Sequence, residues 1–160
     1  MKGDSPPHKS SGMISGILRE FEPGRGNLLP ILHRLQESSP NHYLSEEALE
    51  KTAAYLNLSC ATVHGVASFY SMFSTEPRGK YIIRVCTSPS CHVQNTILGT
   101  LEEVLGISLG GTTSDHLFTL ESSSCLGLCD RTPVMMINDE IYDELTPEKA
   151  RDILERKSHE

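Results

Sequence analysis

Two short segments, Cys86-Thr-Ser-Pro-Ser-Cys91 and Cys125-Leu-Gly-Leu-Cys129, determine how the whole sequence is interpreted. Their cysteines are spaced C-x4-C and C-x3-C, and each pair follows a run of strand-forming residues, 81–85 and 118–121. Loops that leave two neighbouring strands can bring four sulfurs to one point. Four convergent thiols indicate either a metal centre or two disulfides.

The rest of the composition favours a metal centre over two disulfides. Five cysteines are an odd count, which leaves one thiol over from any set of pairs. Residues 1–12 lack the apolar core of a secretory signal, and we expect them to form a disordered tail. A chain kept in the cytoplasm normally has reduced thiols. We therefore expect a cytoplasmic protein whose paired cysteines bind metal.

Charge and hydropathy restrict the possible partners. The 160 residues carry 14 basic and 21 acidic side chains, a net charge of −7. This balance argues against broad binding to nucleic acid or to an anionic membrane. The chain also lacks a run of about 18 apolar residues, so we expect no insertion into a membrane.

The first half has the periodicity of helices. Apolar residues recur at helical spacing in four segments: 13–21, 27–35, 46–56 and 60–73. Ser45 and Ser59 are suited to cap the third and fourth of these helices, and Asn57 to end the third. Residues 13–78 are thus predicted to form a small helical bundle that ends at the turn Glu76-Pro-Arg-Gly79.

The second half changes period and is predicted to form an α/β domain over residues 79–160. Strand patterns occupy residues 81–85, 118–121, 133–137 and 140–145, and a helical pattern lies at 93–105. Thr146 followed by Pro147 is a strong start for a last helix. The order β-α-β-β-(β)-α and the preceding bundle together indicate the α+β class.

The spacing of the cysteines distinguishes between two kinds of metal centre. A two-iron cluster is wider than a single ion, so ligand pairs separated by three or four residues suit it. Structural zinc more often uses C-x2-C pairs, and a zinc-stabilised, non-redox interaction module remains the alternative. The cluster with its four thiolates carries −2, and −3 when reduced. An acidic protein therefore favours a low potential, near the ~−400 mV of plant-type ferredoxins. Backbone N–H groups of Leu126, Gly127 and Leu128 are placed to hydrogen-bond to the sulfurs, which would partly offset this lowering of the reduction potential.

The cysteine segments, with Asp130-Arg-Thr-Pro-Val-Met-Met-Ile-Asn138 after them, closely resemble the thioredoxin-like [2Fe–2S] subunit of NADH:quinone oxidoreductase. Related subunits occur in NAD(P)-linked hydrogenases and formate dehydrogenases. Val63-His-Gly-Val-Ala-Ser-Phe-Tyr70 and Phe73 resemble the signature helix of this family, so the similarity covers roughly residues 15–155. It implies a thioredoxin-like second domain.

The resemblance also implies a function. Cys86, Cys91, Cys125 and Cys129 would bind one [2Fe–2S] cluster. The chain would exchange single electrons with a flavoprotein subunit that binds FMN and NAD(H), within a complex that includes further iron–sulfur or hydrogenase subunits. It would thus be the iron–sulfur subunit of an oxidoreductase, with no catalytic residue, nucleotide site or substrate site of its own. Pro89 departs from the pattern, because it removes a backbone donor in the first loop. A free-standing ferredoxin is a further alternative.

Other candidate residues are weaker. Cys60 and His64 are spaced i, i+4 but have no evident further partners, so we interpret Cys60 as a buried structural thiol. His92 is placed either to donate a hydrogen bond near the cluster or to face water. Asp130 and Arg131 are suited either to a local ion pair or to a docking contact. Neither a G-x-G-x-x-G after a strand nor a phosphate-binding G-x4-G-K-[ST] motif occurs.

Overall fold

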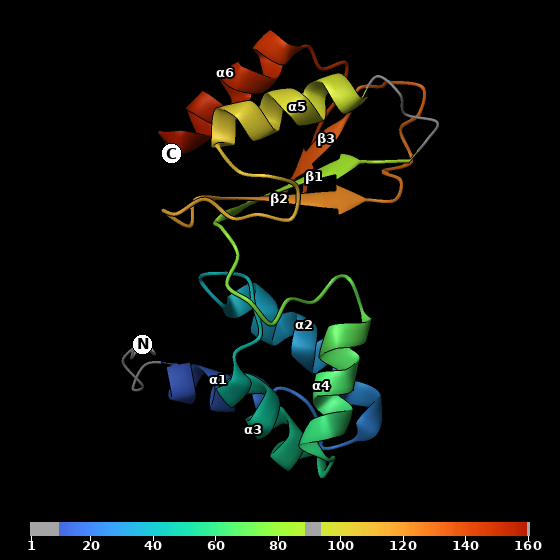
Figure 1. Cartoon of the computed structure of the whole chain (residues 1–160). Coiled ribbons are helices and arrows are strands. Elements are labelled where there is room, and N and C mark those ends of the chain that lie inside the picture. The colour runs from blue at the N-terminus through green and yellow to red at the C-terminus, as the bar shows by residue number, and fades with distance from the viewer. Residues whose placement is uncertain (1–9, 89–93, 160) are drawn as a thin grey trace. The chain divides into compact units, whose positions relative to one another are not determined.

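The computed structural model describes residues 10–88 and 94–159, and the chain divides into two compact units (Figure 1). The first unit ends at Pro77 and contains helices. The second begins at Arg78 and contains a mixed sheet with two helices.

The helical unit is built from α1 (Ser10–Leu18), the 3-10 turn η1 (Arg25–Asn27), α2 (Leu28–Ser38), α3 (Glu46–Leu56) and α4 (Cys60–Phe69). Their apolar stripes meet in one core, in which Ile31, Leu32 and Val63 are fully buried. The predicted N-caps are confirmed. Ser45 Oγ accepts from Ala48 N at 3.2 Å, and Ser59 Oγ from Thr62 N at 3.1 Å.

Several helix limits differ from the prediction. The helix α1 spans Ser10–Leu18 rather than 13–21, α2 spans Leu28–Ser38 rather than 27–35, and α4 ends at Phe69 instead of continuing to Phe73. The buried side chain of Gln36 explains the early end of α4. Its amide donates to Met72 O at 2.9 Å and accepts from Ser74 N at 2.8 Å. Because these bonds satisfy the backbone of a non-helical segment, Phe73 can pack into the core from a loop.

The second unit contains β1 (Tyr81–Cys86), α5 (Gln94–Leu105), β2 (Phe118–Ser123), β3 (Met135–Ile137), β4 (Glu140–Tyr142) and α6 (Pro147–Ser158). The sheet order is β2-β1-β3-β4. The strand β1 runs parallel to β2 and antiparallel to β3, and β4 is antiparallel to β3. The predicted α+β class and the predicted order of elements are confirmed.

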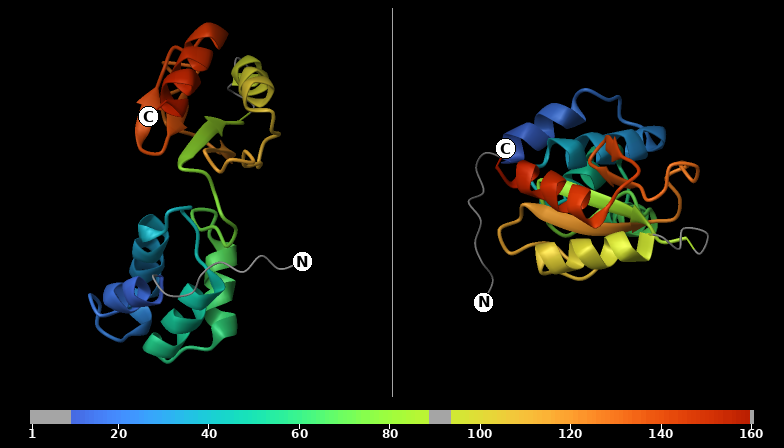
Figure 2. Two further views of the ribbon diagram at one scale, coloured as in Figure 1. Left: turned by 90° about the vertical axis from the view of Figure 1, so that its left-hand side faces the viewer. Right: turned by 90° about the horizontal axis from the view of Figure 1, so that it is seen from above.

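Alternate residues of the strands face the two helices. Tyr81, Ile83 and Val85 of β1 pack into the core of this unit with buried side chains of α5 and α6. Both helices lie on the same side of the sheet (Figures 1 and 2). Thr146 caps α6, accepting from Lys149 N at 3.3 Å, with Pro147 at the first helical position as predicted. The core therefore fixes β1 and the first half of β2.

The opposite face of the sheet carries a cluster of charges. Glu121 of β2 accepts from Arg78 at 3.0 Å and from its cross-strand neighbour Arg84 of β1 at 3.2 Å. The Arg78 side chain is only 6% exposed, and that of Glu121 is 25% exposed. The carboxylate of Glu121 thus joins β2 to β1 and to Arg78, which lies three residues before β1.

The outer edge of β2 is covered by residues 110–113. Gly110 N donates to Leu120 O at 2.7 Å, and Leu120 N donates to Gly111 O at 3.0 Å. Thr113 N donates to Phe118 O at 2.9 Å. These bonds use the backbone groups that an edge strand would otherwise present to water.

Over residues 10–88 and 94–159, none of the helices has the length and apolar character needed to cross a bilayer.

Candidate metal centre

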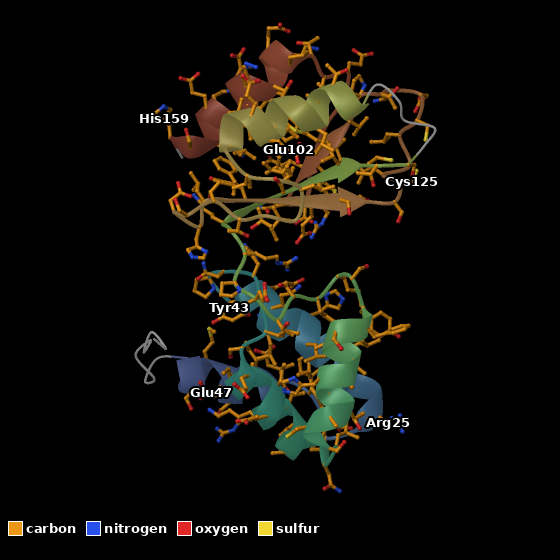
Figure 3. The ribbon with its side chains drawn as sticks, in the orientation of Figure 1. Arg25, Tyr43, Glu47, Glu102, Cys125 and His159 are labelled. Carbon is orange, nitrogen blue, oxygen red and sulfur yellow. The ribbon has the colours of Figure 1, made fainter. Side chains whose placement is uncertain are left out.

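The described cysteines of the two pairs lie at one end of the sheet. Cys86 is the last residue of β1, and Cys125 and Cys129 lie in the loop that follows β2. Because β1 and β2 are parallel and Cys86 pairs with Ser123, both segments leave the sheet at the same place. Figure 3 shows Cys125 beyond the arrowheads of β1 and β2.

These three cysteines line one small open pocket. Leu126, Leu128, Thr132 and Val134 complete its wall, so the sulfurs lie in a largely apolar setting. The fourth predicted ligand, Cys91, lies outside the described residues, as do Pro89 and His92. Within the described ranges, no three His, Cys, Asp or Glu side chains are arranged closely enough to hold a single metal ion.

The two sulfurs of the second pair are spaced for a common metal atom. Cys125 Sγ and Cys129 Sγ are 3.9 Å apart. Metal–thiolate bonds of about 2.3 Å at tetrahedral angles place two sulfurs about 3.8 Å apart. The C-x3-C loop therefore presents two adjacent corners of one tetrahedral site.

A backbone donor within this loop faces a cysteine sulfur. Gly127 N donates to Cys125 Sγ at 3.3 Å, and Gly127 has a φ of +77°, in the left-handed region that glycine adopts most readily. The expectation that this loop supplies an N–H group to a sulfur is confirmed at Gly127. The bond joins residues i and i+2, as in the turns that Asp and Asn side chains make with their own backbone.

The surroundings of Cys86 are different. Cys86 is 3% exposed, and its thiol donates to Ser124 O at 3.3 Å. The Ser88 hydroxyl donates to the same carbonyl, and Thr87 N donates to Ser123 O at 3.1 Å. Ser124 thus ties the end of β1 to the loop after β2. Sequence reasoning missed it, because nothing in Ser122-Ser123-Ser124 distinguishes one serine from the next.

The far side of the cysteine loop is held by Arg131. Its guanidinium lies 3.4 Å from Asp143 and 3.9 Å from Asp130. Its backbone N donates to Leu128 O at 3.1 Å, and its carbonyl accepts from Glu144 N at 3.0 Å. Arg131 therefore makes local ion pairs and anchors the loop to the segment after β4.

Cys60 and His64 are both exposed on α4 and do not line the cysteine pocket. A free thiol is observed at Cys60, but it is exposed rather than buried. The interpretation of Cys60 as a buried structural thiol is therefore wrong: it is the first residue of α4, where only Val63 and Ala67 are buried.

A comparison with known families identifies this arrangement. The family model for thioredoxin-like [2Fe-2S] ferredoxin matches residues 14–158. The chain belongs to the thioredoxin-like [2Fe-2S] ferredoxin family. This confirms the predicted thioredoxin-like fold, and the cofactor of the family is a [2Fe–2S] cluster. Three described thiols at one pocket, two of them at the spacing of a tetrahedral site, fit such a cluster.

Several individual proteins are similar to this ferredoxin-family chain. It is 39% identical over 141 residues to an NADH-quinone oxidoreductase subunit of Mycobacterium bovis, covering 87% of this chain and 55% of that protein. It is 36% identical to the corresponding NADH-quinone oxidoreductase subunit of Rickettsia felis, covering 95% of this chain and 93% of that protein. The chain thus spans about half the length of the mycobacterial relatives but nearly all of the rickettsial one.

Solved structures show the same fold. The crystal structure of an NAD+-reducing [NiFe]-hydrogenase in the air-oxidized state matches with a TM-score of 0.73 and 23% identity, over 89% of this chain and 24% of that chain. The H2-reduced state matches with a TM-score of 0.74 and 25% identity, over 86% and 23%.

Proposed function

We propose that Cys86, Cys91, Cys125 and Cys129 hold one [2Fe–2S] cluster and that the chain transfers single electrons as a subunit of a larger oxidoreductase. The observation that carries this proposal is the convergence of Cys86, Cys125 and Cys129 on one pocket at the ends of two parallel strands. Cys91, the fourth ligand in this proposal, follows Cys86 at a C-x4-C spacing that suits a two-iron cluster.

The residues around the pocket have distinct tasks in this proposal. The cluster supplies one-electron chemistry when bound. Cys86 offers a ligand at a fixed strand end, and the loop from Cys125 to Cys129 offers two ligands at the spacing of one iron. Leu126, Leu128 and Val134 line the pocket with apolar groups beside the buried residue Cys86.

The partner in this proposal is a flavoprotein subunit that binds FMN and NAD(H), in a complex located in the cytoplasm or at its side of a membrane. The names of the relatives support this, since they are subunits of NADH-quinone oxidoreductases and their fold recurs in an NAD+-reducing hydrogenase. A hydride carries two electrons, so a one-electron carrier beside the flavin separates the two transfers. Further iron–sulfur or hydrogenase subunits would receive the electrons.

The test is anaerobic purification, with assays of iron, acid-labile sulfide and zinc and EPR of the dithionite-reduced protein. We expect equal iron and sulfide and a rhombic S = 1/2 signal. Stoichiometric zinc without sulfide would instead support the zinc-stabilised interaction module and overturn the proposal. Purification of the complex from its native host tests the partner. A co-purifying flavoprotein that oxidises NADH is expected, and NADH oxidation by the chain alone would contradict the proposed division of tasks.

A further inference from the structure

We propose that Gly127, through its left-handed backbone and the N–H bond to Cys125 Sγ, raises the reduction potential of the cluster. The inference rests on the proposed function, because it concerns the cluster that Cys125 would bind. It assigns a role to one backbone N–H group of a residue that has no side chain.

The geometry of the turn makes this bond possible. The N–H of Gly127 reaches a sulfur only two residues earlier, at 3.3 Å, with Gly127 at a φ of +77°. L-residues with a side chain rarely adopt this region, and alanine adopts it less readily than asparagine. A Cβ added at Gly127 would meet no heavy atom of residues 10–88 and 94–159 within 4 Å. Among these residues, space therefore does not require glycine here, whereas the backbone conformation favours it.

The expected sign follows from charge. Reduction takes the cluster and its four thiolates from −2 to −3, and an N–H dipole directed at a sulfur stabilises the more negative form. Hydrogen bonds to the sulfurs are among the factors that set iron–sulfur potentials. The opposite contact occurs at Cys86, whose sulfur faces the carbonyl oxygen of Ser124 at 3.3 Å. The exposed sulfur of Cys125 thus faces a backbone donor, Gly127 N–H, whereas the buried sulfur of Cys86 faces a carbonyl acceptor.

A purely structural role predicts something different. If Gly127 only allowed the turn, its substitution would reduce stability or cluster content, and the potential of the remaining cluster would not change. Gly106 offers a matched control, since it has a φ of +65° and an added Cβ there would likewise meet no described atom within 4 Å. It follows α5 and does not line the cysteine pocket.

The first experiment measures the midpoint potential by EPR-monitored titration of the wild-type protein, Gly127→Ala, Gly127→Asn and Gly106→Ala. We expect a lower potential for Gly127→Ala, a smaller decrease for Gly127→Asn, and no change for Gly106→Ala. An unchanged potential in Gly127→Ala, or an equal shift in Gly106→Ala, would overturn the inference.

The second experiment detects the bond without altering the wild-type turn. Protein labelled with 15N only at its 12 glycines is reduced and studied by pulsed EPR (HYSCORE). We expect a 15N coupling in the wild type that disappears in Gly127→Asn, because the nitrogen at position 127 is then unlabelled. Absence of the coupling in the wild type, or its persistence in Gly127→Asn, would overturn the inference even if Gly127→Ala fails to fold. A protein that has no cluster at all would instead refute the proposed function.

Discussion

The two sides of the cysteine pocket are built in opposite ways. Cys86 ends a central strand, is almost fully buried, and its sulfur faces a carbonyl group. Cys125 and Cys129 lie in an exposed loop, and a backbone N–H group faces one of their sulfurs. The difference indicates that β1 provides a fixed ligand, whereas the loop provides ligands whose surroundings can adjust to the cluster and to its charge.

The largest expected effect comes from removing a ligand on either side. We expect Cys86→Ser to lose the cluster, with an affinity loss beyond the ~10–100-fold associated with outer partners of metal ligands. Cys129→Ser should keep part of its iron with an altered EPR signal, because water or the serine oxygen can reach this exposed position. Iron and sulfide assays check both. If Cys86→Ser kept its cluster and Cys129→Ser lost it, the conclusion that Cys86 is the fixed ligand and the loop the adjustable one would be wrong.

The next effect concerns the ion pairs of Glu121, which join β2 to β1, the strand that ends at Cys86. In Glu121→Ala, two arginines lose their shared carboxylate, and the Arg78 side chain is only 6% exposed. Breaking a buried pair costs roughly 3–5 kcal/mol, and since Glu121 is a quarter exposed we expect about 2 kcal/mol.

Urea unfolding of the cluster-free protein measures this cost. The control is Glu103→Ala, whose ion pair with Arg151 is exposed and is worth about 0–1 kcal/mol. Equal losses of unfolding free energy in the two variants would show that the ion pairs of Glu121 stabilise β1 and β2 no more than an exposed ion pair does.

A smaller effect is expected at the loop. Because Arg131 and Asp143 are 60% and 41% exposed, Arg131→Ala should cost less than about 1 kcal/mol of stability. The loop that Arg131 anchors should then open more often, so loss of iron to a chelator should become faster at unchanged initial loading.

Absorbance of the cluster after addition of the chelator follows this rate. Arg34→Ala, which removes a similarly exposed ion pair with Glu20 in the helical unit, is the control and should leave the rate unchanged. A rate unaltered in Arg131→Ala would mean that the loop does not depend on this anchor.

The smallest effect is a pH dependence at the other end of β2. The hydrogen bond from the Thr113 side chain, then that from the backbone of Leu117, lowers the pKa of Asp115 from its ordinary 3.8. A lowered folded pKa adds stability above 3.8 that is lost as the pH falls through the folded value. Asp115→Asn should therefore lose less stability than the wild type on acidification.

Thermal unfolding of cluster-free protein at about pH 5 and about pH 3 measures this difference. Iron loading at neutral pH should be the same in both proteins, because Asp115 precedes β2 whereas the cysteine loop follows it. A steeper acid loss in Asp115→Asn would contradict the sign of the pKa change.

Local features of the fold were predictable from the sequence. The capping residues Ser45, Ser59 and Thr146 act within three residues of themselves, and the strands before the cysteine pairs follow from short apolar runs. Their parallel pairing then explains why Cys86 and the loop from Cys125 to Cys129 meet.

Contacts between distant residues were not predictable. Gln36 ends α4 through bonds that span 36 and 38 residues, and Glu121 reaches Arg78 across 43. The exposure of Cys125 beside a buried Cys86 depends likewise on how two loops fold around Ser124. No periodicity marks a single polar side chain or carbonyl group for such a task.

The segment over the outer edge of β2 has a consequence for association between chains. An uncovered edge strand can recruit a strand from another molecule and so begin aggregation. Residues 110–113 already occupy the backbone donors and acceptors of Phe118 and Leu120 on that edge. From Phe118 to Leu120 this strand is therefore closed to intermolecular sheet extension, and contacts with other proteins along this stretch must be made by side chains.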